Sequence, residues 1–378
     1  MRIAVIGAGI AGLSVAAGLQ RDGYDVTVFE QRPEPSPVGA GLTLFRNACD
    51  ALDMMGLGDS VRAVSGTDIA SMRTGQRDPA GSWLIAVPPS TVASMRSVHR
   101  SELHHTLSSH LFPGTVHAGQ TARVAADGTP RVTIGERAEE FDLVVVADGI
   151  RSTNRKVLGL DTGLRYAGYT AWRGVTHRPV NIGGEAGETW GRGQLFGIVP
   201  LPDHRVYWYA TANLPAGTDF PDEHQAVRDR FAQWHAPIQE CLAATPRAAV
   251  LRHDVYDLSR PLETFTRGRT VLIGDAAHAM TPNLGQGAGQ GIEDAATLTL
   301  LLRDVDTSEL DRALTSYSDL RLNRTSTILH RSRTAGRVAQ AAHPVTVSLR
   351  NTVLRLIPGR LMGAMSQRIQ HRPCPGPR

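Results

Sequence analysis

Apolar and polar positions in the first thirty residues follow the order strand, turn, helix, strand. Residues 3–6 form a short apolar run, residues 13–20 carry apolar side chains at helical spacing, and residues 25–29 alternate as a strand that ends at Glu30. Glycines between residues 7 and 12 separate the first strand from the helix. This βαβ order predicts an α/β fold class with a Rossmann-like domain that contains a parallel sheet.

The middle of the chain has a different pattern. Between about residues 166 and 254, short stretches such as 194–201 and 205–210 alternate as strands, and four of the five Trp lie there. The pattern of a buried parallel strand returns at residues 270–275, and helical spacing follows from about residue 294. We therefore expect a nucleotide-binding domain that is interrupted by a β-sheet domain and followed by C-terminal helices, α+β overall.

Length and composition limit the class of protein. The chain has 378 residues, 41% of them hydrophobic and 20% charged, which suits a globular protein of two lobes. No apolar run approaches the about 18 residues of a membrane span, and the first strand begins too early for a signal peptide. Cys49, Cys241 and Cys374 have no paired spacing, which favours a cytoplasmic protein without disulfides or a metal site.

Charge is distributed unevenly. From residue 320 to residue 378 there are eleven Arg and no Asp or Glu, whereas the rest of the chain has an excess of acidic residues. Residues 345–350 and 353–357 combine an apolar stripe with Arg on the other face. Such a helix either packs on the protein's own nucleotide-binding domain, which we favour, or contacts an anionic membrane peripherally. No aromatic–basic interleaving accompanies the charge, so we expect no binding to nucleic acid.

Residues 7–12 read Gly-Ala-Gly-Ile-Ala-Gly and fit the dinucleotide-binding fingerprint. In this motif the first glycine makes a tight turn, the second lets the backbone approach a pyrophosphate, and the third allows close helix–strand packing. Glu30 lies where an acidic side chain accepts hydrogen bonds from an adenosine ribose. The context of strand, helix and acidic residue predicts a dinucleotide site.

A second segment indicates which dinucleotide. Residues 270–275 place Asp275 at the carboxyl end of a buried strand, where ligands of open α/β sheets bind. A glycine-rich turn at residues 285–291 then leads into a helix, whose N-terminus would stabilise negative charge on the N1–C2=O side of a reduced flavin. We interpret His278, between them, as a structural hydrogen-bonding residue rather than a catalyst.

Several motifs in order resemble the single-component FAD-dependent monooxygenases of the para-hydroxybenzoate hydroxylase family. They are Val28-Phe29-Glu30, the segment at residues 99–103, residues 147–152 and the Gly274-Asp275 segment. The resemblance spans roughly residues 1–350. Residues 169–174, Tyr-Thr-Ala-Trp-Arg-Gly, are most similar to the branch that contains salicylate, 3-hydroxybenzoate and urate hydroxylases and zeaxanthin epoxidase.

The resemblance implies three parts of the chain. The FAD-binding domain comprises residues 1–70, 95–165 and 265–319, the β-rich substrate domain comprises 71–94 and 166–264, and the basic C-terminal helical region comprises 320–378. It also implies a set of cofactor-binding residues. These are Gly7, Gly9, Ala11, Gly12, Glu30, Gln31, Thr43, Arg100, Val124, Asp148, Gly149, Gly274, Asp275, Gly285, Gln286, Gly287 and Ala288.

Within that set, the resemblance implies a place along FAD for each group. Gly9, Ala11 and Gly12 would hold the pyrophosphate, Arg100 the phosphate or ribityl region, and Asp275 a ribityl hydroxyl. Thr43 and residues 282–288 would border the isoalloxazine, and Val124 would pack on the adenine. Asp148-Gly149 belongs to a segment that the family uses for both FAD and the nicotinamide cofactor. No second glycine fingerprint occurs, so NADPH or NADH would bind transiently in a surface groove.

The implied reaction uses O₂ as co-substrate and inserts one oxygen atom into an aromatic substrate through a flavin C4a-hydroperoxide. An FAD-dependent epoxidase of an alkene is a close alternative. Two others are a flavoprotein reductase or cyclase without oxygen insertion, and an FAD-binding protein that catalyses nothing. We expect a monomer or a homodimer.

The substrate is less well defined. Residues 194–201 carry no charged side chain, which favours an uncharged aromatic substrate, polycyclic or indolic, over one held by its carboxylate. Tyr207 and Tyr209 share one face of their strand. Tyr207 either orients a phenol or packs in the core, and Arg173 either reaches the substrate or pairs at the surface. Pro282, Tyr207 and Arg173 are the catalytic candidates.

Overall fold

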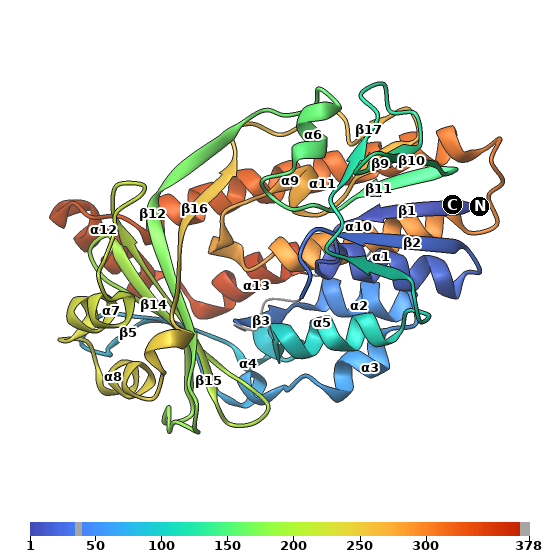
Figure 1. The fold of residues 1–378 in the computed structure, drawn as a ribbon. Coiled ribbons are helices and arrows are strands. Elements are labelled where there is room, and N and C mark those ends of the chain that lie inside the picture. Colours follow the sequence, from blue (N-terminus) through green and yellow to red (C-terminus); the bar gives the residue numbers. More distant parts are fainter. Residues whose placement is uncertain (35–39, 371–378) are drawn as a thin grey trace.

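The computed structural model describes residues 1–34 and 40–370, so Cys374 lies outside the described residues. A six-stranded sheet has the order β17-β18-β11-β1-β2-β7 and is parallel except for β17 (Figure 1). Its strands are β1 (Arg2–Ile6), β2 (Asp25–Glu30), β7 (Val116–Ala118), β11 (Leu143–Val146), β17 (Thr266–Arg267) and β18 (Thr270–Leu272). The predicted βαβ opening and the α/β fold class, α+β overall, are confirmed.

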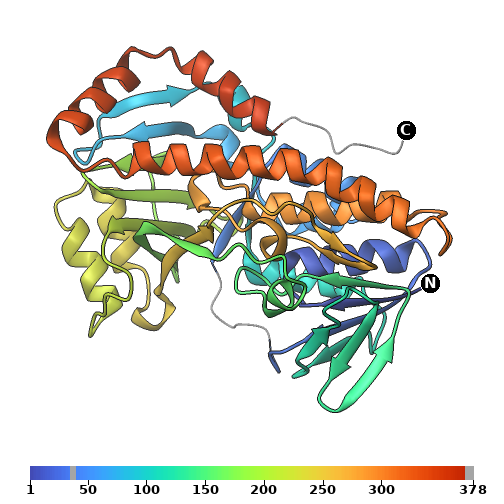
Figure 2. The ribbon, with the colours of Figure 1, turned by 90° about the horizontal axis from the view of Figure 1, so that it is seen from above.

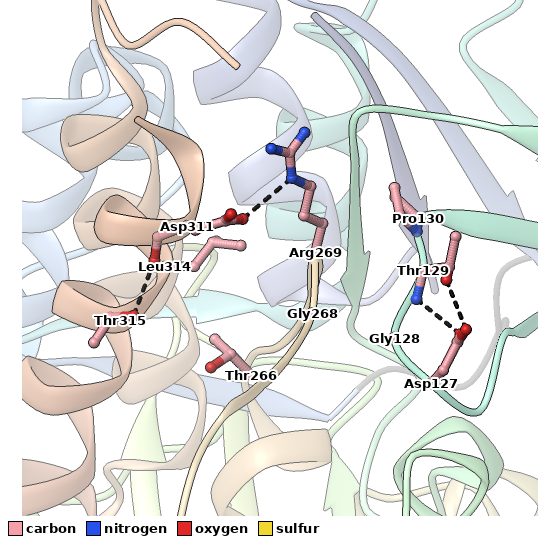
Figure 3. Close-up of a pocket in the computed structure, with 10 residues that line it drawn as sticks. All are labelled: Asp127, Gly128, Thr129, Pro130, Thr266, Gly268, Arg269, Asp311, Leu314 and Thr315. Atoms are coloured by element: carbon pink, nitrogen blue, oxygen red, sulfur yellow. Dashed lines mark hydrogen bonds and ion pairs between the residues drawn. The ribbon is translucent and has the colours of Figure 1, made fainter. Parts of the chain in front are cut away.

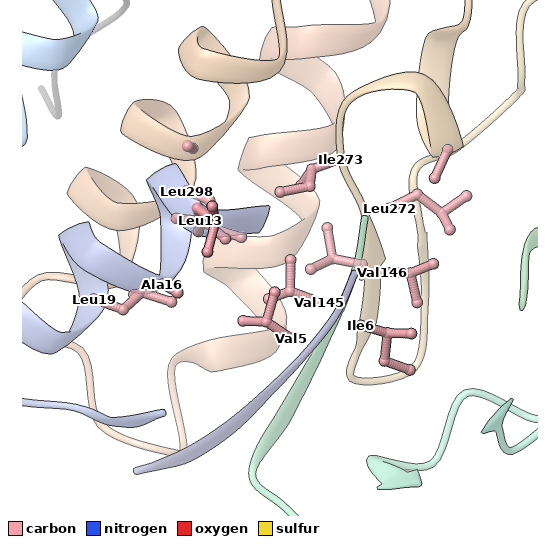
Figure 4. Packing of buried hydrophobic residues seen from close by; sticks show 14 of the residues in the cluster. Val5, Ile6, Leu13, Ala16, Leu19, Val145, Val146, Leu272, Ile273 and Leu298 are labelled. Atoms are coloured by element: carbon pink, nitrogen blue, oxygen red, sulfur yellow. The ribbon is translucent and has the colours of Figure 1, made fainter. Parts of the chain in front are cut away.

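The core of this first lobe forms because its central strands are apolar on both faces. Val5 of β1 and Val145 of β11 are adjacent in register and fully buried. They lie close to Leu13 of α1 (Ile10–Arg21) and Leu298 of α10 (Gly287–Leu302), as Figure 4 shows. Burying such side chains contributes about 1.5–3 kcal/mol each, which fixes the sheet and the two helices as one rigid support.

A second, seven-stranded sheet has the order β16-β12-β15-β14-β13-β4-β5, and only its β13–β4 pair is parallel. Its strands are β4 (Arg73–Arg77), β5 (Trp83–Val87), β12 (Leu164–Val175), β13 (Glu185–Trp190), β14 (Gln194–Pro200), β15 (Val206–Asn213) and β16 (Leu251–Leu258). Trp172, Phe196 and Trp208 on one face pack against α7 (Glu223–Phe231) and α8 (Ala236–Ala243). The other face, here called the inner face, lies toward the first lobe.

Shorter elements connect and cover the two sheets. Strands β3 (Gly41–Leu44) and β6 (Arg96–His99) pair with each other, as do β8 (Ala122–Val124), β9 (Arg131–Ile134) and β10 (Arg137–Glu140). The remaining helices before residue 300 are α2 (Arg46–Met54), α3 (Gly58–Ala63), α4 (Pro89–Val92), α5 (Arg100–Ser109), α6 (Thr153–Val157) and α9 (Asp275–His278), with 3₁₀ turns η1 (Asp68–Ser71), η2 (Arg247–Ala249) and η3 (Pro282–Leu284).

Three helices end the described chain. The 30-residue α11 (Leu310–Ala339) runs along both lobes, and α12 (Pro344–Leu356) and α13 (Gly359–Gln370) then fold over β4 and β5 (Figure 2). Within the described residues, no helix combines the length and apolar character needed to cross a bilayer.

The apolar stripe of α12 lies differently from what the sequence suggested. Leu354 packs on Leu84 and Ile85 of β5, so this helix covers the second sheet rather than the first lobe. Arg350 points inward and is buried, whereas Val345, Leu349 and other apolar side chains of the stripe point outward. Arg350 is stabilised there because its guanidinium donates to the carbonyls of Gly191 and Ala339.

Candidate active site

The glycine turn before α1 leaves open space where an anion would bind. Gly7 has φ +107°, and a Cβ there would collide with the carbonyl of Ala147, while a Cβ on Gly12 would collide with the carbonyl of Gly7. A Cβ on Gly9 would meet nothing within 4 Å. Because α1 has neither a side-chain cap nor an acidic first turn, its first N–H groups stay free for a ligand.

Glu30 ends β2 next to this turn. Its carboxylate accepts hydrogen bonds from the backbone N–H of Ala8 at 2.8 Å and of Arg32 at 2.9 Å. A carboxylate has about four acceptor sites, so capacity remains for ribose hydroxyls. Gln31 is exposed beside it.

Asp148 and Gly149 follow β11 and adjoin the same edge of the sheet. The side-chain amide of Asn154 donates to Asp148 Oδ2 at 3.0 Å, and its oxygen accepts from the backbone of the buried Val124 at 3.0 Å. In the described part of the chain, Asp148 Oδ1 is buried without a hydrogen-bond partner. Gly149 has φ +82°, and a Cβ there would meet nothing within 4 Å. A ligand donor at this point would satisfy the orphaned oxygen.

The Gly274–Asp275 turn lies directly against the glycine turn. Gly274 has φ +59°, and a Cβ there would be 2.9 Å from the Cβ of Ala11. The backbone N–H of Gly274 donates to Asp294 Oδ2 at 2.7 Å. Asp275 is exposed, and no hydrogen bond to its carboxylate is found among residues 1–34 and 40–370. Its carboxylate is therefore available to a hydroxyl of the ligand.

A buried ionic cluster beneath this turn was not predicted from the sequence. Asp294 accepts from His278 Nε2 at 2.5 Å and from Arg321 Nε at 2.6 Å, and Arg321 and Arg324 both donate to Glu293. Against the effect of burial, His278 and Arg321 hold the pKa of Asp294 below its usual value. The interpretation of His278 as structural agrees with this position.

The second glycine-rich turn leads into α10 without a cap. Gly285 is in the left-handed conformation at φ +63°, and a Cβ there would lie 2.9 Å from the ring of Phe45. Gln286 is buried and accepts from Asn47 at 3.0 Å, while Gly287 faces open space and Ala288 is half-buried. No side-chain cap and no acidic first turn occupy the N-terminus of α10, which can stabilise an anionic ligand edge.

The inner face of the second sheet meets the first lobe next to these turns. A Cβ on Gly41 of β3 would overlap the ring of Tyr207, so β3, which also carries the half-buried Thr43, lies directly over that tyrosine. The hydroxyl of Tyr169 donates to Asn283 in η3 at 2.7 Å. Pro282, the first residue of η3, is exposed beside it.

Arg173 and Tyr207 lie together on this inner face. Burial raises the pKa of Tyr207, and the positive charge of the neighbouring Arg173 opposes that rise. Arg173 is half-buried on the inner face and forms no ion pair within the described residues. Arg100, at the start of α5, is exposed and close enough to act electrostatically on Tyr207.

Glu188 was missed in the sequence. It lies on β13, and its carboxylate accepts from the hydroxyl of Tyr209 at 2.7 Å and from Trp190 Nε1 at 2.7 Å. The alternation of residues along the strand indicates that Tyr207 and Tyr209 share one face of the sheet. That Glu188 lies opposite Tyr209 depends on the order of the strands, which local sequence patterns do not predict.

A hollow of about 460 Å³ lies away from all candidate residues (Figure 3). It is lined by the loop at residues 127–130, the β17–β18 hairpin and the start of α11. Arg269, at its rim, donates to Asp311 at 3.1 Å. None of the predicted site residues lines it, so we assign it no part in the site.

The residues around the two glycine turns fit FAD. Gly9, Gly149 and Gly287 leave open space, and within the described residues one oxygen of Asp148 and the carboxylate of Asp275 have no hydrogen-bond partner. Two helix N-termini face this region from α1 and α10. Together with the parallel sheet, these features define a flavoprotein of the dinucleotide-binding class.

Comparison with known proteins identifies the family. The family model for the FAD binding domain matches residues 1–332. Aurachin C monooxygenase/isomerase of Stigmatella aurantiaca is 33% identical and 2-heptyl-3-hydroxy-4(1H)-quinolone synthase of Pseudomonas aeruginosa is 34% identical, each over 97% or more of both chains. The crystal structure of Klebsiella pneumoniae HpxO complexed with FAD and uric acid superposes with a TM-score of 0.87 at 26% identity, covering 98% of this chain and 96% of that one. The chain belongs to the FAD-dependent aromatic monooxygenases of the para-hydroxybenzoate hydroxylase type.

Proposed function

We propose that this monooxygenase acts on an uncharged bicyclic aromatic with a ring nitrogen, of the quinolone type. The observation that carries the proposal is the inner face itself. On this face Arg173 lies beside Tyr207, and Glu188 has no cationic partner within the described residues. A substrate carboxylate would be repelled by Glu188, because no cation neutralises that side chain within the described residues. An uncharged ring with a polar N–H would not be repelled.

The comparisons support the same substrate class. The two relatives whose names concern aurachin C and a 4(1H)-quinolone match this chain over nearly its whole length, including the second sheet. The FAD-dependent urate hydroxylase of Klebsiella pneumoniae matches at 31% over 88% of the chain.

FAD, when bound and reduced by NADPH or NADH, supplies the activation of O₂ and the transfer of one oxygen atom. In our proposal Gly9, Ala11 and Gly12 hold its pyrophosphate, Glu30 its ribose, and Asp275 its ribityl chain. The N-terminus of α10 favours the anionic form of the reduced ring. The inner face, with Tyr207 and Arg173, positions the substrate, while β3 and η3 cover it and exclude water.

The test is oxidation of NADPH and NADH by the FAD-loaded protein with 2-heptyl-4(1H)-quinolone, indole, urate and salicylate, recorded together with O₂ uptake and product mass. We expect the quinolone to accelerate oxidation and to gain one oxygen atom. Acceleration by urate or salicylate alone would overturn the proposed substrate class. The product structure distinguishes hydroxylation from epoxidation, and oxidation without a product would indicate a reductase.

The outer surface of α12 and α13 supports a second proposal, contact with an anionic lipid surface. Val345, Leu349 and Leu356 are 68%, 63% and 76% exposed, and Leu361 and Met365 continue the stripe at 56% and 57%. No acidic residue follows position 319, and exposed arginines flank the stripe, so the charge complements anionic headgroups. Co-sedimentation with phosphatidylglycerol vesicles, but not with phosphatidylcholine vesicles, is expected; equal behaviour of wild type and Leu349→Glu would contradict it.

We also propose a cytoplasmic location and a monomeric or homodimeric state. Cys49 and Cys241 are free thiols, which supports a reducing compartment. Sedimentation velocity distinguishes the two oligomeric states.

A further inference from the structure

Glu188 reaches the centre of the inner face because a glycine lies between it and Tyr209. Glu188 on β13 pairs with Gly197 on β14, and Gly197 pairs with Tyr209 on β15. A Cβ on Gly197 would overlap the ring of Tyr209, so the ring lies flat across the position of the missing side chain. The tyrosine hydroxyl thereby crosses one whole strand to reach Glu188 Oε1 at 2.7 Å.

Glu188 differs from the fully buried carboxylates of this protein. Asp257 is held by Arg165 and Arg333, and Glu293 is held by Arg321 and Arg324. Within residues 1–34 and 40–370, Glu188 has two neutral donors, Tyr209 and Trp190, and no ion pair. Burying a carboxyl group without a cationic partner costs folding free energy. A role in binding a ligand would account for its presence here.

The neighbourhood of Glu188 leaves room for a third donor. Two of its about four acceptor sites are used, and the residue keeps part of its accessible surface although protein surrounds it. Burial raises its pKa, and the bonds from Tyr209 and Trp190 oppose that rise. The guanidinium of Arg350 lies over the ring of Trp190, 5.4 Å from its centroid. Its hydrogen bonds go to Asn351 and to backbone carbonyls, and none to Glu188 is found among the described residues.

The row that contains Glu188 crosses the inner face as far as Arg173. Arg173, Tyr209, Gly197 and Glu188 are consecutive partners across four strands, so their side chains share the inner face. The ring of Tyr207 lies 5.9 Å from that of Tyr209 and is covered by β3. A planar substrate along this row would have one edge toward β3 and the other toward Glu188.

We propose that Glu188 accepts a hydrogen bond from a ring N–H of the substrate and thereby selects donors over their N-alkylated analogues. The proposal rests on the function proposed above and specifies how that substrate class is recognised. Tyr209 and Trp190 act as positioning residues, because they fix the two carboxylate oxygens that face the ligand.

The experiment compares 2-heptyl-4(1H)-quinolone with its N-methyl derivative, which cannot donate. Dissociation constants are read from the change in flavin absorbance of the oxidised, FAD-loaded protein. We expect wild type to bind the N–H compound about 10- to 100-fold more tightly, as for a hydrogen bond to a charged group. In Glu188→Gln one carbonyl oxygen must serve both Tyr209 and Trp190, so the N–H compound should bind more weakly and the preference should fall to about 1.

Glu223→Gln is the matched control. Glu223 accepts from Trp172 Nε1 at 2.7 Å, the same kind of contact, but on the opposite face of the sheet. The Glu223→Gln variant should therefore leave the preference for the N–H compound unchanged. If Glu188→Gln folds poorly, Glu188→Ala takes its place in the experiment. Its FAD content and melting temperature are checked first.

The outcomes separate the two proposals. A preference that survives in Glu188→Gln and Glu188→Ala, or equal weakening of both ligands, overturns the role of Glu188 and leaves the proposed function standing. Failure of wild type to bind either quinolone overturns the proposed function, and with it the inference.

Discussion

Arg321 Nε lies 2.6 Å from Asp294 Oδ1, and both side chains are completely buried between α10 and α11. The same Asp294 holds the backbone N–H of Gly274, the residue before Asp275. The long helix α11 thus supports the Gly274–Asp275 turn through one buried ion pair.

Replacing Arg321 by Met should destabilise the protein strongly. Asp294 and Glu293 would lose a buried cation, and such a loss costs about 3–5 kcal/mol. Urea unfolding measures the change. Arg331→Met, at an exposed position of α11, should change stability by less than about 0.5 kcal/mol. Similar effects of the two variants would show that the ion pair contributes little.

Acid should destabilise the protein partly through Asp294. Its pKa is lowered in the folded state because, against burial, His278 and Arg321 favour the carboxylate. A group of this kind stabilises fully above its unfolded pKa, about 3.9, and loses that contribution as the pH falls from there through the folded pKa. Unfolding free energies measured from about pH 5 down to about pH 2 should fall less steeply in Asp294→Asn than in wild type. Parallel pH curves would refute the assignment.

Asp275→Ala should lose FAD affinity and keep its fold. The carboxylate is exposed and has no hydrogen-bond partner among the described residues, so folding does not depend on it. A lost bond from a ribityl hydroxyl to a carboxylate corresponds to about 10- to 100-fold weaker binding. Flavin fluorescence titration gives the dissociation constant, and the exposed Asp219→Ala is the control. Unchanged flavin occupancy would remove Asp275 from the site.

Glu30→Ala should weaken FAD binding through the adenosine end. FMN lacks adenosine, so its affinity should change little while that of FAD falls about tenfold or more. Equal losses for both flavins would mean that Glu30 acts only by organising the N–H groups of Ala8 and Arg32.

Tyr207→Phe tests whether this tyrosine does more than pack. The charge of Arg173 acts on this hydroxyl on the inner face, so removing the hydroxyl should lower kcat/KM for the substrate and leave flavin reduction without substrate unchanged. Arg173→Met should have an effect that is not additive with it. Full product formation by Tyr207→Phe would make the tyrosine a core residue.

Local patterns predicted the parts of this protein that short segments determine. The βαβ opening, the glycine turns and Asp275 after β18 are each encoded within a few residues. Tyr207 and Tyr209 were placed on one face because strand geometry alone requires it.

Contacts between distant strands and helices could not be predicted in the same way. Glu188 meets Tyr209 only because β13 and β15 flank β14, and Arg321 meets Asp294 only through the packing of α11 on α10. The sequence places Arg321 and Arg324 in the basic C-terminal region, yet they neutralise buried acids. Charge composition does not reveal which members of a charged segment are inside.

Gly197 contributes no atom to recognition, yet it decides whether Tyr209 can span the strand to Glu188. A relative that gains a side chain at this position cannot keep the tyrosine ring there, and its carboxyl group would be left without the donor that orients it. Positions 188, 197 and 209 should therefore be exchanged together among homologous sequences, as a linked signature of what each enzyme accepts.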